Sequence, residues 1–226
     1  MLYLVLTNCV TEWKEACVAD NTLQLIARIS SRIFLGEELC RNEVWLRIAQ
    51  EYTVEMFKAA IQMTVFPSGL KFFLPWVLKE CKTVLQIQNK ARAIITPIIE
   101  NRRQIKAEAK RKGESIPVFN DSLEWAETEC QGTPYNPQDF QLLLTFAAIH
   151  TTSSLLGQTI LRLANEPHLI PVLREEIISV LQANGLNKNG LYNLKLMDSA
   201  IKETQRVTPD TICRFPILTL LKYLYN

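Results

Sequence analysis

The sequence predicts a mainly α-helical protein, and three observations support this. Apolar residues recur at helical spacing in long segments, whereas the alternation expected of β-strands does not persist over any useful length. Asn, Asp, Pro and Gly residues stand where such helices would begin and end. The composition, 48% hydrophobic and 21% charged among 226 residues, is ordinary for a folded chain with a sizeable core.

Two helices are expected in the first third of the chain. Residues 20–34 carry two neighbouring lines of apolar side chains at helical spacing, and Gly36 supplies a stop. Asn42 then stands at the cap position of an amphipathic segment over residues 43–64. The first of these helices is expected to be buried.

The next stretch combines a connection with a long basic helix. Residues 66–76 hold chain breakers among aromatic residues, so an irregular connection is expected there. Packing over the core, a ligand entrance and a membrane contact all stay open for its aromatic side chains. Residues 77–112 are expected to form one helix that Pro97 kinks and that ends in a basic run suited to the helix dipole. Residues 121–130 follow as a short acidic helix.

The central segment, residues 138–165, is apolar on nearly every side, which is typical of a helix in the middle of a domain. Asn136 and Pro137 mark its start, and Asp139 places a carboxylate near the positive end of the helix dipole. Pro167 follows its end. This segment is expected to be the organising helix of the fold.

One stripe of this central helix carries the candidate binding residues. Its members follow the spacing that puts side chains on a single face: Ala147, Ala148, Thr151, Thr152 and Leu155. The alanines lower that face and the threonines put hydroxyls beside the depression, so a flat ligand fits there with polar groups at its edge. Close packing against another helix, with each threonine hydroxyl bonded to a carbonyl one turn earlier, explains the same stripe. Both interpretations stay open on the residues alone.

Two further helices are expected after the central one. Residues 167–184 form an amphipathic helix, with Leu169 and Val172 among its inward-facing residues. A polar loop is expected at residues 187–190. The last helix is expected over residues 192–207.

Charge, cysteine content and missing motifs exclude several classes. The net charge of +2 is too small to indicate a nucleic-acid partner, and no nucleic-acid-binding motif accompanies it. The six cysteines lack a Cys-x-x-Cys pair and histidines at zinc spacing, which favours reduced thiols in an intracellular setting over disulfides or structural zinc. The apolar first six residues are much shorter than the ~20 that a membrane span needs, so no span or secretory signal is expected. The absence of an Asp-Asp-x-x-Asp motif argues against a terpene cyclase.

Three motifs occur in a fixed order. An Ala-Ala-x-x-Thr-Thr pattern at residues 147–152 is followed by Leu-Arg-Glu-Glu-Ile at residues 173–177 and by Glu-x-x-Arg at residues 203–206. In this order and spacing the chain resembles the cytochrome P450 family, the haem-thiolate monooxygenases, and most closely its fungal members that oxidise terpenoids and related natural products. The resemblance implies the helical core of the cytochrome P450 fold, incomplete, over residues 1–209, with a divergent tail over residues 210–226.

The resemblance carries over to the central helix residue by residue. Ala147 and Ala148 would leave room beside the distal haem face for oxygen and substrate, although the family usually has glycine where Ala148 stands. Thr152 and Leu155 would continue this haem-facing stripe. Thr151 would hydrogen-bond the oxygen that the haem activates and help to deliver protons for O–O cleavage.

His150 and the Glu-x-x-Arg pair receive expected roles from the same resemblance. The family usually has an acid where His150 stands. Because histidine titrates near neutrality, proton transfer by His150 and a merely structural histidine stay equally open. Glu203 and Arg206 would be structural, holding the segment that follows their helix through an ion-paired network.

The resemblance implies haem as cofactor, an apolar small-molecule substrate, a reductase as electron donor, and an intracellular location at the endoplasmic reticulum membrane. The family's proximal cysteine lies in a Phe-x-x-Gly-x-x-x-Cys-x-Gly loop downstream of Glu-x-x-Arg, and neither Cys40 nor Cys213 has that context. We therefore expect no metal ligand and no catalysis from the chain as written. A non-catalytic helical binding or interaction fragment, or a pseudogene product, is the alternative.

Overall fold

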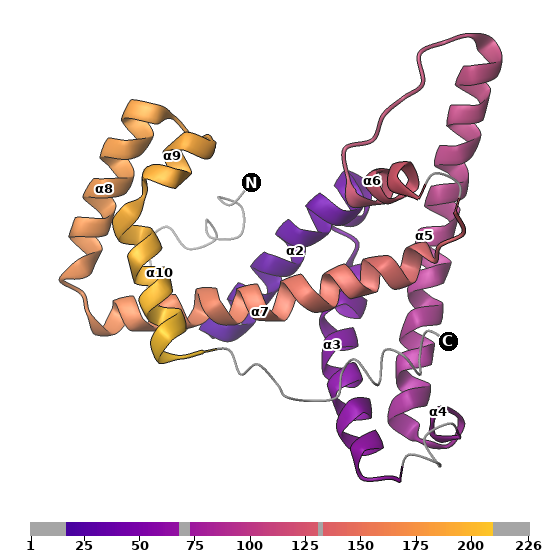
Figure 1. Ribbon diagram of the computed structural model, residues 1–226, viewed down its shortest axis with the longest axis horizontal. Helices are drawn as coiled ribbons and strands as arrows, with labels where there is room; N and C mark the ends of the chain where they lie inside the picture. Colours follow the sequence, from indigo (N-terminus) through magenta and orange to yellow (C-terminus); the bar gives the residue numbers. More distant parts are fainter. Residues whose placement is uncertain (1–16, 68–72, 131–132, 210–226) are drawn as a thin grey trace. The chain divides into compact units, whose positions relative to one another are not determined.

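The computed structural model describes residues 17–67, 73–130 and 133–209, and every regular element within them is an α-helix (Figure 1). The predicted mainly α fold is therefore confirmed. The helices are α2 (Val18–Leu39), α3 (Glu43–Thr64), α4 (Leu74–Val77), α5 (Lys79–Lys112), α6 (Ser122–Glu129), α7 (Pro137–Asn165), α8 (Leu169–Asn184), α9 (Lys188–Asn193) and α10 (Lys195–Val207). The proposed tail and the apolar first six residues lie outside the described residues.

The described residues divide into two compact units. The larger comprises residues 23–150, with most of α2, helices α3 to α6 and the first half of α7. The smaller comprises residues 17–22 and 151–209, with the second half of α7 and helices α8 to α10. The candidate residues of α7 are divided between the units, with Ala147 and Ala148 in the larger and Thr151, Thr152 and Leu155 in the smaller.

Gly36 interrupts α2 where the sequence predicts a stop. Its φ of 76° and ψ of −163° are not helical, and helical residues resume beyond it as far as Leu39. A Cβ at this position would lie 2.9 Å from Oδ2 of Asp121. Both the backbone conformation and the close approach of the carboxylate therefore require glycine.

The core of the larger unit lies where α3 packs against α5. Asn42 caps α3 as predicted, because its side chain accepts a hydrogen bond from the backbone N–H of Trp45 at 2.9 Å. The buried Trp45 ring in turn donates from Nε1 to Ser31 Oγ of α2 at 3.1 Å. Further buried residues repeat at helical spacing on both helices: Ala49, Tyr52, Met56 and Ala59 on α3, and Val84, Ala91 and Ile95 on α5.

The single helix predicted over residues 77–112 is wrong at its start. Leu78 is extended, so the chain forms the short helix α4 before it and α5 after it. Pro75 lies in the first turn of α4, where a missing backbone N–H costs no helical hydrogen bond. Part of the predicted irregular connection is therefore helical, and its residues 68–72 lie outside the described residues. Pro97 lies inside α5, and α5 continues past it to a left-handed cap at Gly113.

α7 begins at Pro137 and ends at Asn165, one residue from the predicted start and at the predicted end. Its buried face carries Leu142, Thr145 and Ile149. Among the described helices, α7 is the one long and apolar enough to cross a membrane by length and composition, with a mean hydropathy of 1.2. A core helix passes the same test, so this finding qualifies the expectation of no membrane span without reversing it.

The smaller unit departs from the sequence prediction in three places. The last helix, predicted over residues 192–207, begins at Lys195, because Leu194 is not helical. The polar loop predicted at residues 187–190 is wrong, because α9 begins there with the side chain of Asn187 accepting a hydrogen bond from the Gly190 N–H at 3.0 Å. Leu169 and Val172, predicted to face inward on α8, are 39% and 49% exposed. Of the α8 residues, Leu173 is buried.

Candidate functional site

The candidate stripe on α7 lies on the side of the helix away from its buried residues. Ala147, Thr151 and Thr152 are exposed, and Ala148 and Leu155 are half-buried. Ile149 and Ser153, which fall between these positions on the opposite face, are buried. In the described residues the stripe therefore faces away from the buried side of α7.

His150 fastens α7 to α3 in the larger unit. Its Nε2 lies 2.9 Å from the backbone carbonyl oxygen of Gln50. A carbonyl only accepts, so Nε2 carries the hydrogen in this contact. One turn earlier, the rings of Phe146 and Phe57 stack with centroids 5.5 Å apart and an interplanar angle of 30°. These two contacts position the helix from which the stripe projects.

A buried polar chain holds α7 from another side. Gln141 is fully buried, and its Nε2 donates to Ser122 Oγ of α6 at 2.8 Å. Ser122 Oγ in turn donates to the carbonyl oxygen of Phe34 in α2 at 2.9 Å. This link between three helices was not predicted, and the available signal was the Gln141 amide beside the apolar residues of α7.

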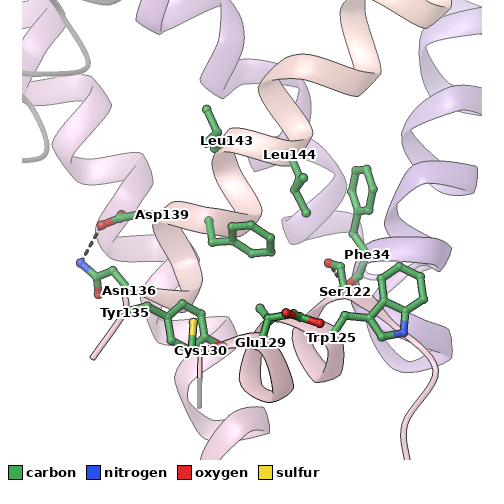
Figure 2. A pocket seen from close by; sticks show the side chains of 12 residues that line it. Phe34, Ser122, Trp125, Glu129, Cys130, Tyr135, Asn136, Asp139, Leu143 and Leu144 are labelled. Carbon is green, nitrogen blue, oxygen red and sulfur yellow. Dashed lines mark hydrogen bonds between the residues drawn. The ribbon is translucent and has the colours of Figure 1, made fainter. Parts of the chain in front are cut away.

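A cavity of about 750 Å³ lies between the end of α2, α6 and the first turns of α7 (Figure 2). Its lining is mainly apolar and includes Trp125, Phe140, Leu143 and Leu144. This volume lies within the range of small-molecule sites. Leu143 and Leu144 stand one turn before Ala147 and Ala148, so the same face of α7 continues from the cavity into the stripe.

The polar end of the cavity is formed by Asn136 and Asp139 (Figure 2). The Asn136 amide donates to Asp139 Oδ2 at 2.6 Å, so the two residues that mark the start of α7 pair with each other. Burial raises the pKa of the Asp139 carboxyl, and the Asn136 hydrogen bond and the charge of Arg92 oppose that rise. The carboxyl therefore remains protonated to a higher pH than an exposed aspartate.

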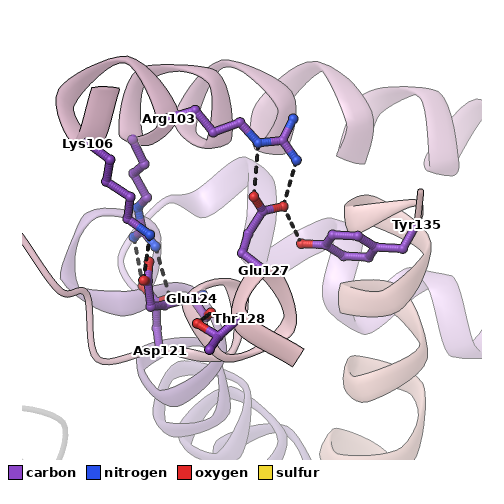
Figure 3. Close-up of polar contacts among 8 residues, drawn as sticks. Arg103, Lys106, Asp121, Glu124, Glu127, Thr128 and Tyr135 are labelled. Atoms are coloured by element: carbon purple, nitrogen blue, oxygen red, sulfur yellow. Dashed lines mark hydrogen bonds and ion pairs between the residues drawn. The ribbon is translucent and has the colours of Figure 1, made fainter. Parts of the chain in front are cut away.

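A polar cluster between α5 and α6 supports the cavity wall (Figure 3). Glu127 accepts two hydrogen bonds from Arg103, at 2.9 and 2.7 Å, and one from the Tyr135 hydroxyl at 2.8 Å. The Arg103 hydrogen bond is the main cause that lowers the pKa of Glu127. Lys106 pairs with Glu124 in the same cluster. These contacts hold α6, which carries Trp125, against α5.

The Glu-x-x-Arg pair forms on α10 as its spacing predicts. Arg206 donates from Nε and Nη2 to the two carboxylate oxygens of Glu203, at 2.8 and 2.6 Å. The Arg206 hydrogen bond lowers the pKa of Glu203, and the charge of Arg162 adds to that effect. The side chains of Arg206 and Glu203 are 71% and 57% exposed. The pair is therefore formed but open to solvent.

The sequence model of the family described as Cytochrome P450 matches residues 16–216 of the chain. The chain belongs to the cytochrome P450 family. Similar proteins include cytochrome P450 monooxygenase 1 of Gibberella fujikuroi, 43% identical over 214 residues, which are 92% of this chain and 48% of that protein. Cytochrome P450 monooxygenase eqxH of Fusarium heterosporum is 44% identical over 209 residues, 92% of this chain and 40% of that protein. Cytochrome P450 monooxygenase hepE of Aspergillus oryzae is 44% identical over 201 residues, 88% of this chain and 37% of that protein.

The chain thus spans less than half the length of these cytochrome P450 relatives. Family membership confirms the resemblance drawn from the three motifs. Because α7 carries the Ala-Ala-x-x-Thr-Thr pattern, the candidate stripe lies on the helix that the resemblance assigns to the distal side of the haem.

The described residues fit one side of a haem. The stripe of α7 carries two alanines and two threonines, of which Ala147, Thr151 and Thr152 are exposed, and these residue types suit a flat group with polar atoms at its edge. Of the described cysteines, Cys40 and Cys81 are buried, Cys130 is half-buried and Cys17 is exposed, and burial raises the pKa of the Cys81 thiol. None of the four stands in the sequence context that the resemblance requires of the proximal ligand. Within the described part of the chain, no group of three or more His, Cys, Asp and Glu residues converges as a metal site.

Proposed function

We propose that this chain is the distal-side helical part of a haem-dependent monooxygenase that acts on an apolar small molecule in fungal secondary metabolism. The observation that carries the proposal is the exposed stripe of small residues and hydroxyls on the central helix of a family-matched chain. The haem, when bound, supplies the activation of dioxygen for insertion of one oxygen atom into the substrate.

In this proposal each residue of the stripe has a separate task. Ala147 and Ala148 end at Cβ, so they leave volume for dioxygen and substrate above the stripe. The Thr151 hydroxyl donates a hydrogen bond into that volume and passes a proton through it. Thr152 and Leu155 extend the contact of α7 with the cofactor.

His150 carries the weaker of the two proposed proton-transfer roles. Its Nε2 hydrogen already meets the Gln50 carbonyl oxygen, so proton transfer by His150 requires Nδ1 or a rotation of the ring. The same contact supports the structural alternative, in which His150 holds α7 at a fixed distance from α3. Replacement by Asn separates the two, because Asn keeps a donor but does not titrate.

The apolar cavity supports the proposed class of substrate. Phe140, Leu143 and Leu144 line it and precede the stripe on one face of α7. A reductase as electron donor and a location at the endoplasmic reticulum membrane belong to the same proposal, by analogy with the family.

A chimera tests the proposed function. Residues 16–216 replace the aligned segment of the Gibberella fujikuroi relative, and the carbon monoxide spectrum of the reduced, haem-loaded protein is recorded. A thiolate-type Soret band is expected, with reductase-dependent dioxygen consumption. A soluble, helical chimera that binds no haem would contradict the proposal.

Two threonine variants of this chimera test the stripe itself. Thr151→Ala is expected to raise several-fold the share of consumed dioxygen that is released as peroxide, because the proton donor is lost. Thr152→Ala is the matched control and is expected to change that share less. Equal effects of the two variants would remove Thr151 from the proposed role.

The chain as an isolated polypeptide has a second candidate function, a non-catalytic interaction fragment. Four apolar side chains of α8 are exposed: Leu169, Ile170, Val172 and Ile178. Size-exclusion chromatography and hydrogen exchange of the isolated chain test this alternative. A monomer with slow exchange throughout α8 would count against it.

A further inference from the structure

We propose that Glu176 is a positioning residue: its carboxylate caps the first turn of α10 from α8 and so sets the direction of the helix that carries Glu203 and Arg206. Glu176 belongs to the Leu-Arg-Glu-Glu-Ile motif, for which the candidate site has no other use. The link from helix direction to the cofactor rests on the proposed function, whereas the capping contact does not.

The carboxylate of Glu176 makes two hydrogen bonds to the backbone of α10. Oε1 accepts from the Leu196 N–H at 2.7 Å, and Oε2 accepts from the Met197 N–H at 3.0 Å. The first N–H groups of an α-helix have no acceptor within the helix, so one side chain satisfies two of the four groups that would otherwise need one. All the atoms concerned lie in the smaller unit.

α10 has no local residue that performs this task. Its N-cap position holds Leu194, whose side chain makes no capping hydrogen bond. The acidic residue of its first turn, Asp198, is engaged by Lys202 Nζ at 2.7 Å, one turn further along. Glu176 thus supplies from 20 residues away the acceptor that Ser, Thr, Asp or Asn normally supplies in sequence.

The charge of Glu176 strengthens the contact. A carboxylate at a helix N-terminus faces the positive end of the helix dipole, and hydrogen bonds to an ionised acceptor are shorter and stronger than neutral ones. A glutamine at the same place retains one acceptor oxygen but loses the charge and the second acceptor. Glu176→Gln therefore weakens the cap without removing side-chain volume from α8.

The position of Arg206 depends on the direction of α10. Arg206 lies about 14 Å along the helix from Met197, so a tilt of the first turn moves the guanidinium sideways. The Glu203–Arg206 pair is exposed and internal to α10, and therefore does not orient the helix by itself. The hydrogen bonds from the backbone of Leu196 and Met197 to Glu176 tie the first turn of α10 to α8.

Hydrogen exchange of the full chain tests the cap. Glu176→Gln is expected to speed amide exchange in the first turn of α10 about tenfold, and Glu175→Gln, the adjacent exposed residue of the same helix, is the matched control with no expected change. The double variant Glu176→Gln with Leu194→Asp is expected to regain protection, because aspartate then caps α10 locally. Unchanged exchange in Glu176→Gln, or an equal change in Glu175→Gln, would overturn the proposal.

The same variants in the chimera test the link to the cofactor. Glu176→Gln is expected to release haem several-fold faster than Glu175→Gln, and Leu194→Asp is expected to restore retention in the double variant. A parent chimera without a thiolate-type spectrum would contradict the proposed function. Hydrogen exchange of the full chain would then still test whether Glu176 caps α10. Faster exchange with unchanged haem retention would overturn the link from α10 to the cofactor.

Discussion

Two arginine–carboxylate pairs, each joined by two hydrogen bonds, occupy opposite environments in the two units. Arg102 in α5 donates from Nη1 and Nη2 to the two oxygens of Asp121, at 2.9 and 2.7 Å, and the side chains are 10% and 3% exposed. Arg206 holds Glu203 through a similar pair of hydrogen bonds, with side chains 71% and 57% exposed. Geometry alone therefore does not distinguish a fold-determining pair from an exposed one.

The difference lies in what each pair touches. Asp121 also caps α6 by accepting from the Glu124 N–H at 3.1 Å, its other oxygen approaches Gly36, and Arg102 lies 4.3 Å over the Phe119 ring. The buried pair thus joins three elements of the larger unit. The exposed pair on α10 joins residues of one helix, and the resemblance assigns it a contact with the segment that follows that helix.

The largest effect is expected from Asp121→Ala. The substitution leaves the buried Arg102 guanidinium without its partner and removes the cap of α6, so the free energy of unfolding should fall by about 3–5 kcal/mol. Urea unfolding followed by circular dichroism measures it. Asp198→Ala is the control, since its pair with Lys202 is exposed on α10. A loss below about 1 kcal/mol for Asp121→Ala would show that the buried pair contributes no more than a surface pair.

A smaller loss, about 1–3 kcal/mol, is expected from Gly36→Ala, because φ of 76° with ψ of −163° is a glycine conformation and the new Cβ would meet Asp121 Oδ2. Gly113→Ala separates the two causes. Gly113 has a φ of 70° with nothing within 4 Å of its Cβ position, so only the conformational cost applies there. Thermal unfolding of the two variants should rank Gly36→Ala as the more damaging. A larger loss for Gly113→Ala than for Gly36→Ala would mean that the Asp121 carboxylate moves away from the new Cβ without an energetic cost.

Glu127 represents the intermediate case, with a side chain 23% exposed. Because hydrogen bonds from Arg103, and next from Tyr135, lower its pKa in the folded state, its contribution to stability is present above the ordinary value of 4.5 and is lost as pH falls below it. Glu127→Gln should therefore destabilise the chain near neutrality and much less in acid. Unfolding midpoints of both proteins across this pH range test the sign. A difference that grows toward low pH would contradict it.

A contact in this structure is predictable from the sequence when the two interacting residues lie close together along the chain. Asn42, Pro137 and Gly36 act within a few residues of their positions, so the start of α3, the start of α7 and the break in α2 follow from local chemistry. The Glu203–Arg206 pair is likewise local. By contrast, Gln141 reaches Ser122 across 19 residues of chain, and neither periodicity nor capping rules indicate such a contact.

The missed role of Glu176 has this cause, whereas the missed helix α9 does not. Residues 187–190 have the composition of a turn, but the cap of α9, in which Asn187 accepts from the Gly190 N–H, is as local as the cap of α3. The sequence predicts Glu176 to be a solvated residue of an amphipathic helix, because the N–H groups that donate to its carboxylate belong to α10 and are distant in sequence. Tertiary contacts of this kind decide the candidate site, whereas local signals decide most of the helices.

The smallest effect on stability is expected at the exposed pair. Glu203→Gln should leave the unfolding midpoint of this chain unchanged, because water replaces the lost contact with Arg206 and no other element of the described residues is joined by it. The same substitution in the chimera is expected to speed haem release, since the pair would there meet the segment that follows α10. The substitution at Asp121 would then lower the free energy of unfolding, whereas the substitution at Glu203 would lower haem retention and leave the free energy of unfolding unchanged. A stability loss at Glu203 in the isolated chain, measured by the same urea titration, would place both pairs in one structural class.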